Sequence, residues 1–99
     1  MIELSDILAA ARRIRGVADA TPLVPSPFMT ARAGAEVLLK LENMQPIGAF
    51  KLRGALNAVA ALEGAAGVTC CSTGNHGRGV AWAARTRGMR AVICMSELV

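Results

Sequence analysis

Lys51 is the residue of this sequence whose type and position most clearly suggest chemistry. It falls near the start of a helix expected over residues 50–62, directly after Phe50. The positive end of a helix dipole disfavours a cation there, and Arg53 adds a second positive charge nearby. Both effects favour the neutral amine with which a lysine forms a Schiff base, and Phe50 adds a flat apolar surface. The alternative is a solvated lysine at a helix start, because most lysines lie on protein surfaces.

A second candidate site is the glycine-rich segment 72–79, between a strand expected over residues 68–71 and a helix expected over residues 80–86. In open α/β sheets ligands bind where strands end, and free N–H groups at a helix start attract carboxylates or phosphates. The candidate substrate-binding residues are Ser72, Thr73, Gly74, Asn75 and His76. A capped turn that binds nothing is the alternative reading of the same segment.

Neither a metal site nor a dinucleotide site is expected. His76 is the only histidine, and the only soft ligands are Cys70, Cys71 and Cys94. Neighbouring residues in a strand point to opposite faces, so Cys70 and Cys71 cannot readily share a metal or a disulfide. All three cysteines are expected to be reduced, buried thiols. The glycine spacing of residues 74–79 is the reverse of the dinucleotide fingerprint, and no acidic residue follows at the usual distance.

Alternating helices and strands are expected to position these two segments. Ser5 can cap the first helix and Gly16 can end it, while Ser26 and Pro27 can start a second helix that stops at Gly34. The expected order is helix (6–15), helix (26–34), strand (36–42), helix (50–62), strand (68–71), helix (80–86) and strand (90–95). This alternation predicts an α/β fold, with a parallel sheet and flanking helices.

The composition is that of a globular protein, with 54% hydrophobic and 18% charged residues in a chain of 99. The net charge is +4, but the arginines are scattered without interleaved aromatic residues, so no nucleic-acid partner is expected. No apolar run reaches the roughly 18 residues that cross a membrane, and the first residues lack the pattern of a signal peptide. We therefore expect a cytoplasmic protein without a membrane partner.

Taken together, the motifs resemble those of the threonine/serine dehydratases, a branch of the fold-type II (tryptophan synthase β-like) enzymes that use pyridoxal 5'-phosphate. The matching motifs occur in the family's order and nearly fill the chain. They are TPL at 21–23, LKLE at 39–42, QP at 45–46, G at 48 with FKLRGA at 50–55, and S at 72 with GNHG at 74–77.

The resemblance implies a cofactor, pyridoxal 5'-phosphate, and a role for each candidate residue. Lys51 would hold the cofactor covalently and remove the substrate's α-proton, Phe50 would pack on the pyridine ring, and Asn75 would bond its phenolic oxygen. The segment from Ser72 to His76 would receive the substrate carboxylate. A small hydroxy amino acid would lose water and yield a 2-oxo acid and ammonia.

Two departures from the family pattern bear on the substrate. Ala49 stands where serine is usual, and Ile47 where threonine is common, so a hydroxyl near the active site would be lost. The wording of residues 70–79 resembles the dehydratases of hydroxyectoine utilisation more than the biosynthetic threonine enzymes. A racemase, a β-replacement enzyme of the same fold and a non-catalytic carboxylate-binding module remain as alternatives.

The family's phosphate cradle would lie downstream of this sequence, which contains no tetraglycine run. Residues 96–99 follow an expected strand at the point where a parallel sheet normally continues. Residues 1–99 are therefore expected to be an incomplete, amino-terminal part of the dehydratase domain, inactive alone. The full-length enzyme is expected to be a homo-oligomer.

Overall fold

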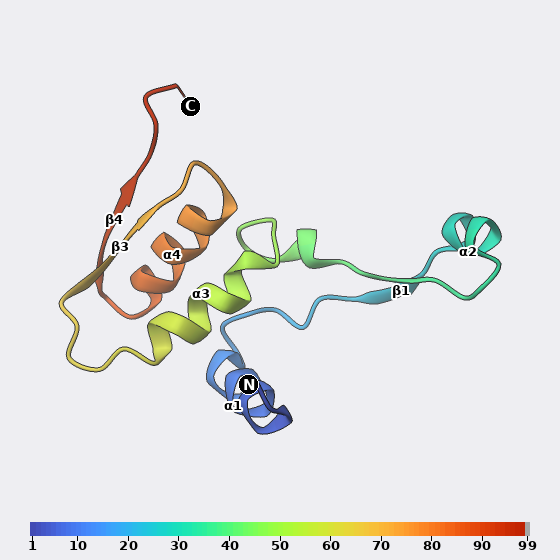
Figure 1. The fold of residues 1–99 in the computed structure, drawn as a ribbon, viewed down its shortest axis with the longest axis horizontal. Coiled ribbons are helices and arrows are strands. Elements are labelled where there is room, and N and C mark those ends of the chain that lie inside the picture. Colours follow the sequence, from blue (N-terminus) through green and yellow to red (C-terminus); the bar gives the residue numbers. More distant parts are fainter. Residues whose placement is uncertain (99) are drawn as a thin grey trace.

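A computed structural model describes residues 1–98, and Val99, the last residue of the expected terminal segment, lies outside the described residues. Helices and strands alternate along the chain (Figure 1). They are α1 (Leu4–Ile14), β1 (Leu23–Pro25), α2 (Pro27–Ala33), β2 (Leu38–Lys40), the short 3₁₀ helix η1 (Glu42–Met44), α3 (Lys51–Ala60), β3 (Gly67–Cys71), α4 (Asn75–Thr86) and β4 (Arg90–Cys94).

Strands β3 and β4 pair in parallel, with α4 connecting them, which confirms the expected α/β arrangement. Gly67 lies opposite Arg90 and Cys71 opposite Cys94. Along both strands half-buried residues alternate with exposed ones. Helix α4 contacts both strands, so one face of this small sheet is partly covered and the other is open. The pairing brings the end of β3 directly to the candidate segment that begins at Ser72.

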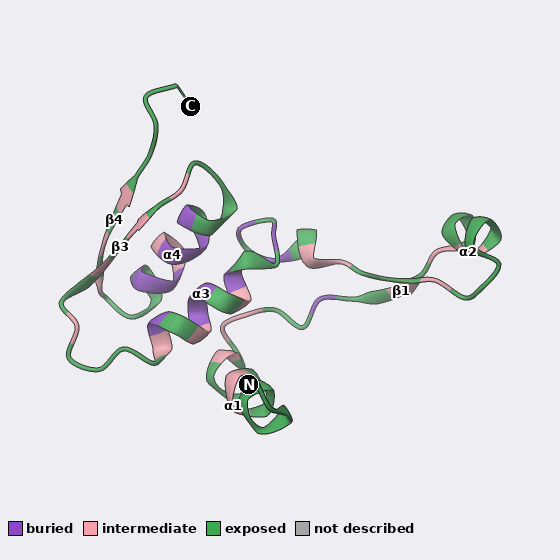
Figure 2. Ribbon diagram, in the orientation of Figure 1, coloured by how far each residue is buried: buried purple, intermediate pink, exposed green. Residues whose placement is uncertain are grey.

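The hydrophobic core lies between α3 and α4, where Figure 2 shows the buried residues concentrated. Leu52 is fully buried and lies one residue after the candidate Lys51. Burial of apolar side chains is the main stabilising contribution of such a core. The buried cluster consists of Ile47, Ala49, Leu52, Ala55, Leu56, Val59, Val80 and Ala83.

Strands β1 and β2, with α2 between them, form an arm that extends away from this core (Figure 1). The strand expected over residues 36–42 is present as β2, but its expected place in the parallel sheet is wrong. It pairs antiparallel with β1, because the extended residues just after Pro22 supply a partner strand. The Leu41 N–H also donates to the Pro22 carbonyl at 3.0 Å. The radius of gyration of 16.3 Å exceeds the roughly 13 Å of a compact chain of this length.

The first two helices differ in how well local signals predict their ends. Helix α2 begins and ends as expected: the Ser26 Oγ accepts a hydrogen bond from the Met29 N–H at 3.4 Å, and Gly34 adopts a φ of 68°. Ser5 does not cap α1, which starts one residue earlier. Glu3 is its N-cap instead, and Asp6 accepts from the Glu3 N–H at 2.9 Å in a capping box.

Helix α4 begins at Asn75, five residues before the expected start at Val80. The glycines at 77 and 79 suggest a loop, but both lie in the helix where neighbouring atoms come close. A Cβ at Gly77 would lie 2.8 Å from the Ile93 Cγ2 atom. Glycine is therefore placed here for close packing of the helix and not for a turn.

The expected burial of the cysteines is wrong for two of them. Cys71 and Cys94 are exposed, and Cys70 is half-buried, because α4 covers only one face of the sheet. All three are free thiols. Within residues 1–98 no three potential metal ligands gather, and no helix is long and apolar enough to cross a membrane.

Candidate active site

Lys51 is the first residue of α3, and its amine lies over the ring of Phe50. The Lys51 Nζ atom is 5.4 Å from the ring centroid, within the range of a cation–π contact. Both residues are exposed, and 61% of Phe50 is accessible. The turn before them depends on Gly48, which has a φ of 74° and donates its N–H to the Gln45 carbonyl at 2.7 Å. An amine beside an exposed aromatic ring is what the sequence predicts for this segment.

The side chain of Lys51 borders an open hollow of about 410 Å³ between α3 and the start of α4. We call it the Lys51 hollow. It is lined by Phe50, Lys51, Arg53, Gly54, Ala55, Ala58, Val59, His76 and Val80. The two candidate segments, far apart in the sequence, therefore meet at one hollow, with His76 representing the second segment.

A close approach of α3 and α4 produces this meeting. A Cβ placed at Gly79 would lie 3.3 Å from both the Ala55 Cβ atom and the Lys51 carbonyl oxygen. A larger residue at 79 would push the start of α4 away from Lys51. The sequence offers a signal for this contact, since Gly79 and Ala55 are both small.

The candidate substrate-binding residues lie at the start of α4, but only His76 lines the hollow. The Ser72 Oγ accepts from the Gly74 N–H at 3.2 Å and so shapes the turn itself. The Asn75 Oδ1 atom accepts from Arg78 at 3.5 Å. Gly74 is the N-cap, and within the described part of the chain no side chain caps the first turn. A helix start of this kind can present its N–H groups to an anion.

Arg53 does not act on Lys51 in the way that the sequence suggests. Its guanidinium is paired with Glu42, at 2.7 Å between Nη2 and Oε1. The negative charge of Glu42 offsets the positive charge that is expected beside Lys51. Sequence reasoning gives Glu42 no role, because its partner lies 11 residues away on another element.

The two departures from the family pattern lie in the core. Ile47 and Ala49 are buried and pack in the cluster between α3 and α4. Neither lines the Lys51 hollow. Their apolar side chains thus contribute to the packing beneath the site.

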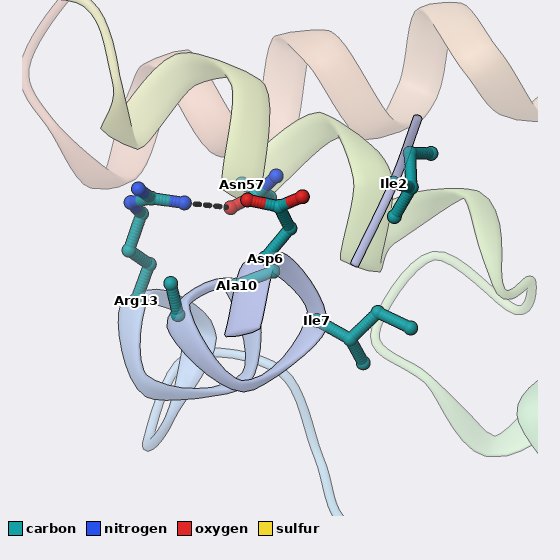
Figure 3. A pocket seen from close by; sticks show the side chains of 7 residues that line it. Ile2, Asp6, Ile7, Ala10, Arg13 and Asn57 are labelled. Atoms are coloured by element: carbon teal, nitrogen blue, oxygen red, sulfur yellow. Dashed lines mark hydrogen bonds between the residues drawn. The ribbon is translucent and has the colours of Figure 1, made fainter. Parts of the chain in front are cut away.

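A second hollow of about 410 Å³ lies between α1 and α3 (Figure 3). Its guanidinium and amide are already paired, since the Arg13 Nη1 atom donates to the Asn57 Oδ1 atom at 3.0 Å. None of the candidate residues borders it; its lining consists of Ile2, Asp6, Ile7, Ala9, Ala10, Arg13 and Asn57. The Lys51 hollow, which has an amine and an imidazole, is the better candidate for chemistry.

Comparisons with known proteins place this site in a family. The profile of the family described as pyridoxal-phosphate dependent enzymes matches residues 14–99. The chain is 45% identical to an L-threo-3-hydroxyaspartate ammonia-lyase of a Pseudomonas species, over 91% of this chain and 29% of the relative.

Solved structures give the same result. A threonine deaminase from the organism abbreviated T.th. has a TM-score of 0.88 and 42% identity, over 95% of this chain and 30% of that one. A maize serine racemase has a TM-score of 0.87 and 38% identity, over 94% and 30% of the two chains. The chain thus spans about 30% of the length of such relatives. Since the family profile covers most of the sequence, this chain belongs to the pyridoxal-phosphate dependent enzymes.

Proposed function

We propose that the full-length protein is a pyridoxal-phosphate dependent ammonia-lyase, which removes water and ammonia from a hydroxy amino acid. The observation that carries the proposal is the position of Lys51. Its amine lies over the exposed Phe50 ring, at a hollow that also receives the start of α4. The family match and the similarity to a threonine deaminase and a hydroxyaspartate ammonia-lyase support the same activity.

The residues present fit this cofactor by their chemistry. Lys51 offers an accessible amine for its aldehyde, and Phe50 offers a flat surface for its ring. The Asn75 side-chain amide would donate to the ring oxygen. When bound, pyridoxal phosphate supplies an electron sink for the electron pair that remains when the substrate's Cα–H bond breaks.

Lys51 has a second task in the proposed reaction. Once the substrate has replaced it on the cofactor, its free amine takes the α-proton at Nζ. The β-hydroxyl then leaves as water, and hydrolysis of the remaining unsaturated amine gives a 2-oxo acid and ammonia. The Phe50 ring beneath the amine limits the directions from which Nζ can approach the substrate.

The start of α4 would bind the substrate carboxylate. The N–H groups of its first turn lie at the positive end of the helix dipole, which favours an anion. Ser72, Thr73 and Gly74 would hold the carboxylate from the preceding turn, and His76 would approach it from the wall of the hollow. These assignments rest on the sequence resemblance and on the closeness of α4 to Lys51.

A racemase is the second candidate, because the maize serine racemase superposes on this chain almost as well as the deaminase. The two activities differ in product, since a racemase returns the enantiomer of its substrate without loss of ammonia. The hydroxyectoine subgroup, the homo-oligomer and the cytoplasmic location stay predictions.

Replacement of Lys51 tests the proposal directly. In the full-length protein, Lys51→Ala should remove the cofactor's absorbance at the edge of the visible range and lower turnover by at least about 1,000-fold, because the variant lacks both the attachment point and the base. Borohydride reduction of the unaltered protein should place a pyridoxyl group on Lys51 and not on Lys40, the only other lysine of this sequence. An unchanged absorbance in Lys51→Ala would contradict the assignment.

Product analysis distinguishes the alternatives. Release of a 2-oxo acid and ammonia from threonine, serine or 3-hydroxyaspartate supports the lyase, and formation of the enantiomer alone supports the racemase. Binding of these amino acids without any product would indicate a non-catalytic module.

A further inference from the structure

Helix α3 begins without the groups that usually stabilise a helix start. Its N-cap residue is Phe50, and no side chain among residues 1–98 caps its first turn. The first turn contains no acidic residue, although it carries the positive charge of Lys51. A cation at this end of the helix dipole is unfavourable, so the first turn needs support from another part of the chain.

Glu42 and Arg53 supply this support through a two-pronged ion pair. The Arg53 Nε atom donates to Glu42 Oε2 at 2.8 Å, and Nη2 donates to Oε1 at 2.7 Å. The same Nη2 donates to the Asp19 carbonyl at 2.9 Å. The Arg53 hydrogen bonds lower the pKa of Glu42 to about 2 and the carboxylate raises the pKa of Arg53. This paired geometry fixes orientation as well as charge.

Two buried polar side chains hold the ion pair in place. Gln45 is 3% exposed; its Nε2 atom donates to the Asp19 carbonyl at 2.8 Å and its Oε1 atom accepts from the Asp19 N–H at 3.0 Å. Thr21 is 4% exposed and donates its hydroxyl to Glu42. Within residues 1–98 no buried side-chain nitrogen or oxygen lacks a partner. A polar network that is fully satisfied in this way is rigid.

We propose that Glu42 and Arg53 are positioning residues, which hold the first turn of α3 so that the Lys51 amine stays over Phe50 and at the hollow. Residues two apart on a helix do not share a face, so Arg53 anchors the turn from a different side than the one from which Lys51 projects. What Lys51 does there rests on the proposed function; that its turn is held by this pair does not.

The chain offers a matched control for this proposal at the other end of the same helix. The Arg87 Nη1 atom donates to the Ala60 carbonyl at 2.7 Å and to the Val59 carbonyl at 3.3 Å, and so supports the last turn of α3. Arg53→Met and Arg87→Met each remove one guanidinium that supports one end of α3. Arg53→Lys keeps the charge but loses the two-pronged geometry.

The test follows amide hydrogen exchange in the cofactor-free, full-length protein and, separately, the rate at which Lys51 acquires a reducible pyridoxyl group. In Arg53→Met, exchange in the first turn of α3 should accelerate roughly tenfold, and labelling of Lys51 should slow roughly tenfold to a hundredfold. Arg53→Lys should show a smaller change of both. Arg87→Met should accelerate exchange only in the last turn and leave labelling unchanged.

The outcomes separate this proposal from the proposed function. If Arg53→Met and Arg87→Met lower the melting temperature alike while Lys51 labelling and first-turn exchange stay normal, the pair is merely structural and the proposal fails. If Lys51 of the unaltered protein is never labelled, the proposed function fails, and accelerated first-turn exchange in Arg53→Met still supports the positioning role.

Discussion

The core between α3 and α4 and the arm formed by β1, α2 and β2 differ in how closely their residues pack. In the core, Leu52 is fully buried and Gly79 brings two helices into contact beside Lys51. On the arm, Phe28 is 65% exposed and its ring contacts mainly the Arg32 guanidinium, 4.6 Å from the ring centroid. The candidate chemistry lies with the core, where packing can hold a reactive side chain in one position.

The largest effect that separates the two regions should come from truncating one apolar side chain in each. In the full-length protein, Leu52→Ala should lower the free energy of unfolding by about 2–5 kcal/mol, because a cavity replaces a fully buried side chain. Phe28→Ala should cost about 0.5 kcal/mol or less, since its ring is exposed. Denaturant unfolding of both variants measures the difference. A loss of several kcal/mol for Phe28→Ala would show that another part of the full-length protein covers the arm.

A pair of glycine substitutions tests the close approach of the helices within the core. Gly79→Val should lower the free energy of unfolding by about 1–3 kcal/mol, because its side chain meets Ala55 and the Lys51 carbonyl. Gly54→Ala is the control within α3, where an added Cβ has no atom within 4 Å in the described structure, and it should stabilise by about 0.5–1 kcal/mol. Equal effects of the two substitutions would mean that contact at Gly79 does not hold the helices together.

The smallest effect concerns the junction between the two regions, where Glu42 follows the arm and Arg53 belongs to the core. Because the pKa of Glu42 falls from its usual 4.5 to about 2, its carboxylate stabilises the fold at pH values above 4.5. This contribution is lost as the pH falls from 4.5 through about 2. Glu42→Gln should therefore cost about 1–2 kcal/mol at neutral pH and progressively less in acid.

Unfolding measured between neutral pH and pH values of about 2 checks this dependence. Glu63→Gln removes a carboxylate at an exposed position and serves as the control. A constant difference between Glu42→Gln and the unaltered protein across this range would show that the carboxylate contributes no stability through its charge.

Features set by neighbouring residues are predictable from the sequence. Ser26 and Gly34 bound α2 as expected, because a side-chain cap and a left-handed glycine act within one turn of the helix. Lys51 is expected at a helix start beside Phe50, and it lies there. The parallel pairing of β3 and β4 follows from the alternation of strand and helix.

Features that depend on distant residues are not predictable in the same way. Nothing near Gly77 or Gly79 in the sequence says that other elements will pack against them, so their spacing suggests a loop. The ion pair of Glu42 with Arg53 requires a turn between two elements, which no local pattern specifies. The expected burial of Cys71 and Cys94 is wrong because it depends on which face of the sheet a helix covers.

The alternation of half-buried and exposed residues in β3 and β4 restricts how the length of the chain can change. Inserting or deleting one residue within β3 would turn Val68 and Cys70 away from α4 and expose the apolar side chain of Val68. The same holds for Ile93 in β4. Changes of length are therefore tolerated in the turns at residues 61–66 and 87–89, whereas the strands must keep their residue count to remain aligned.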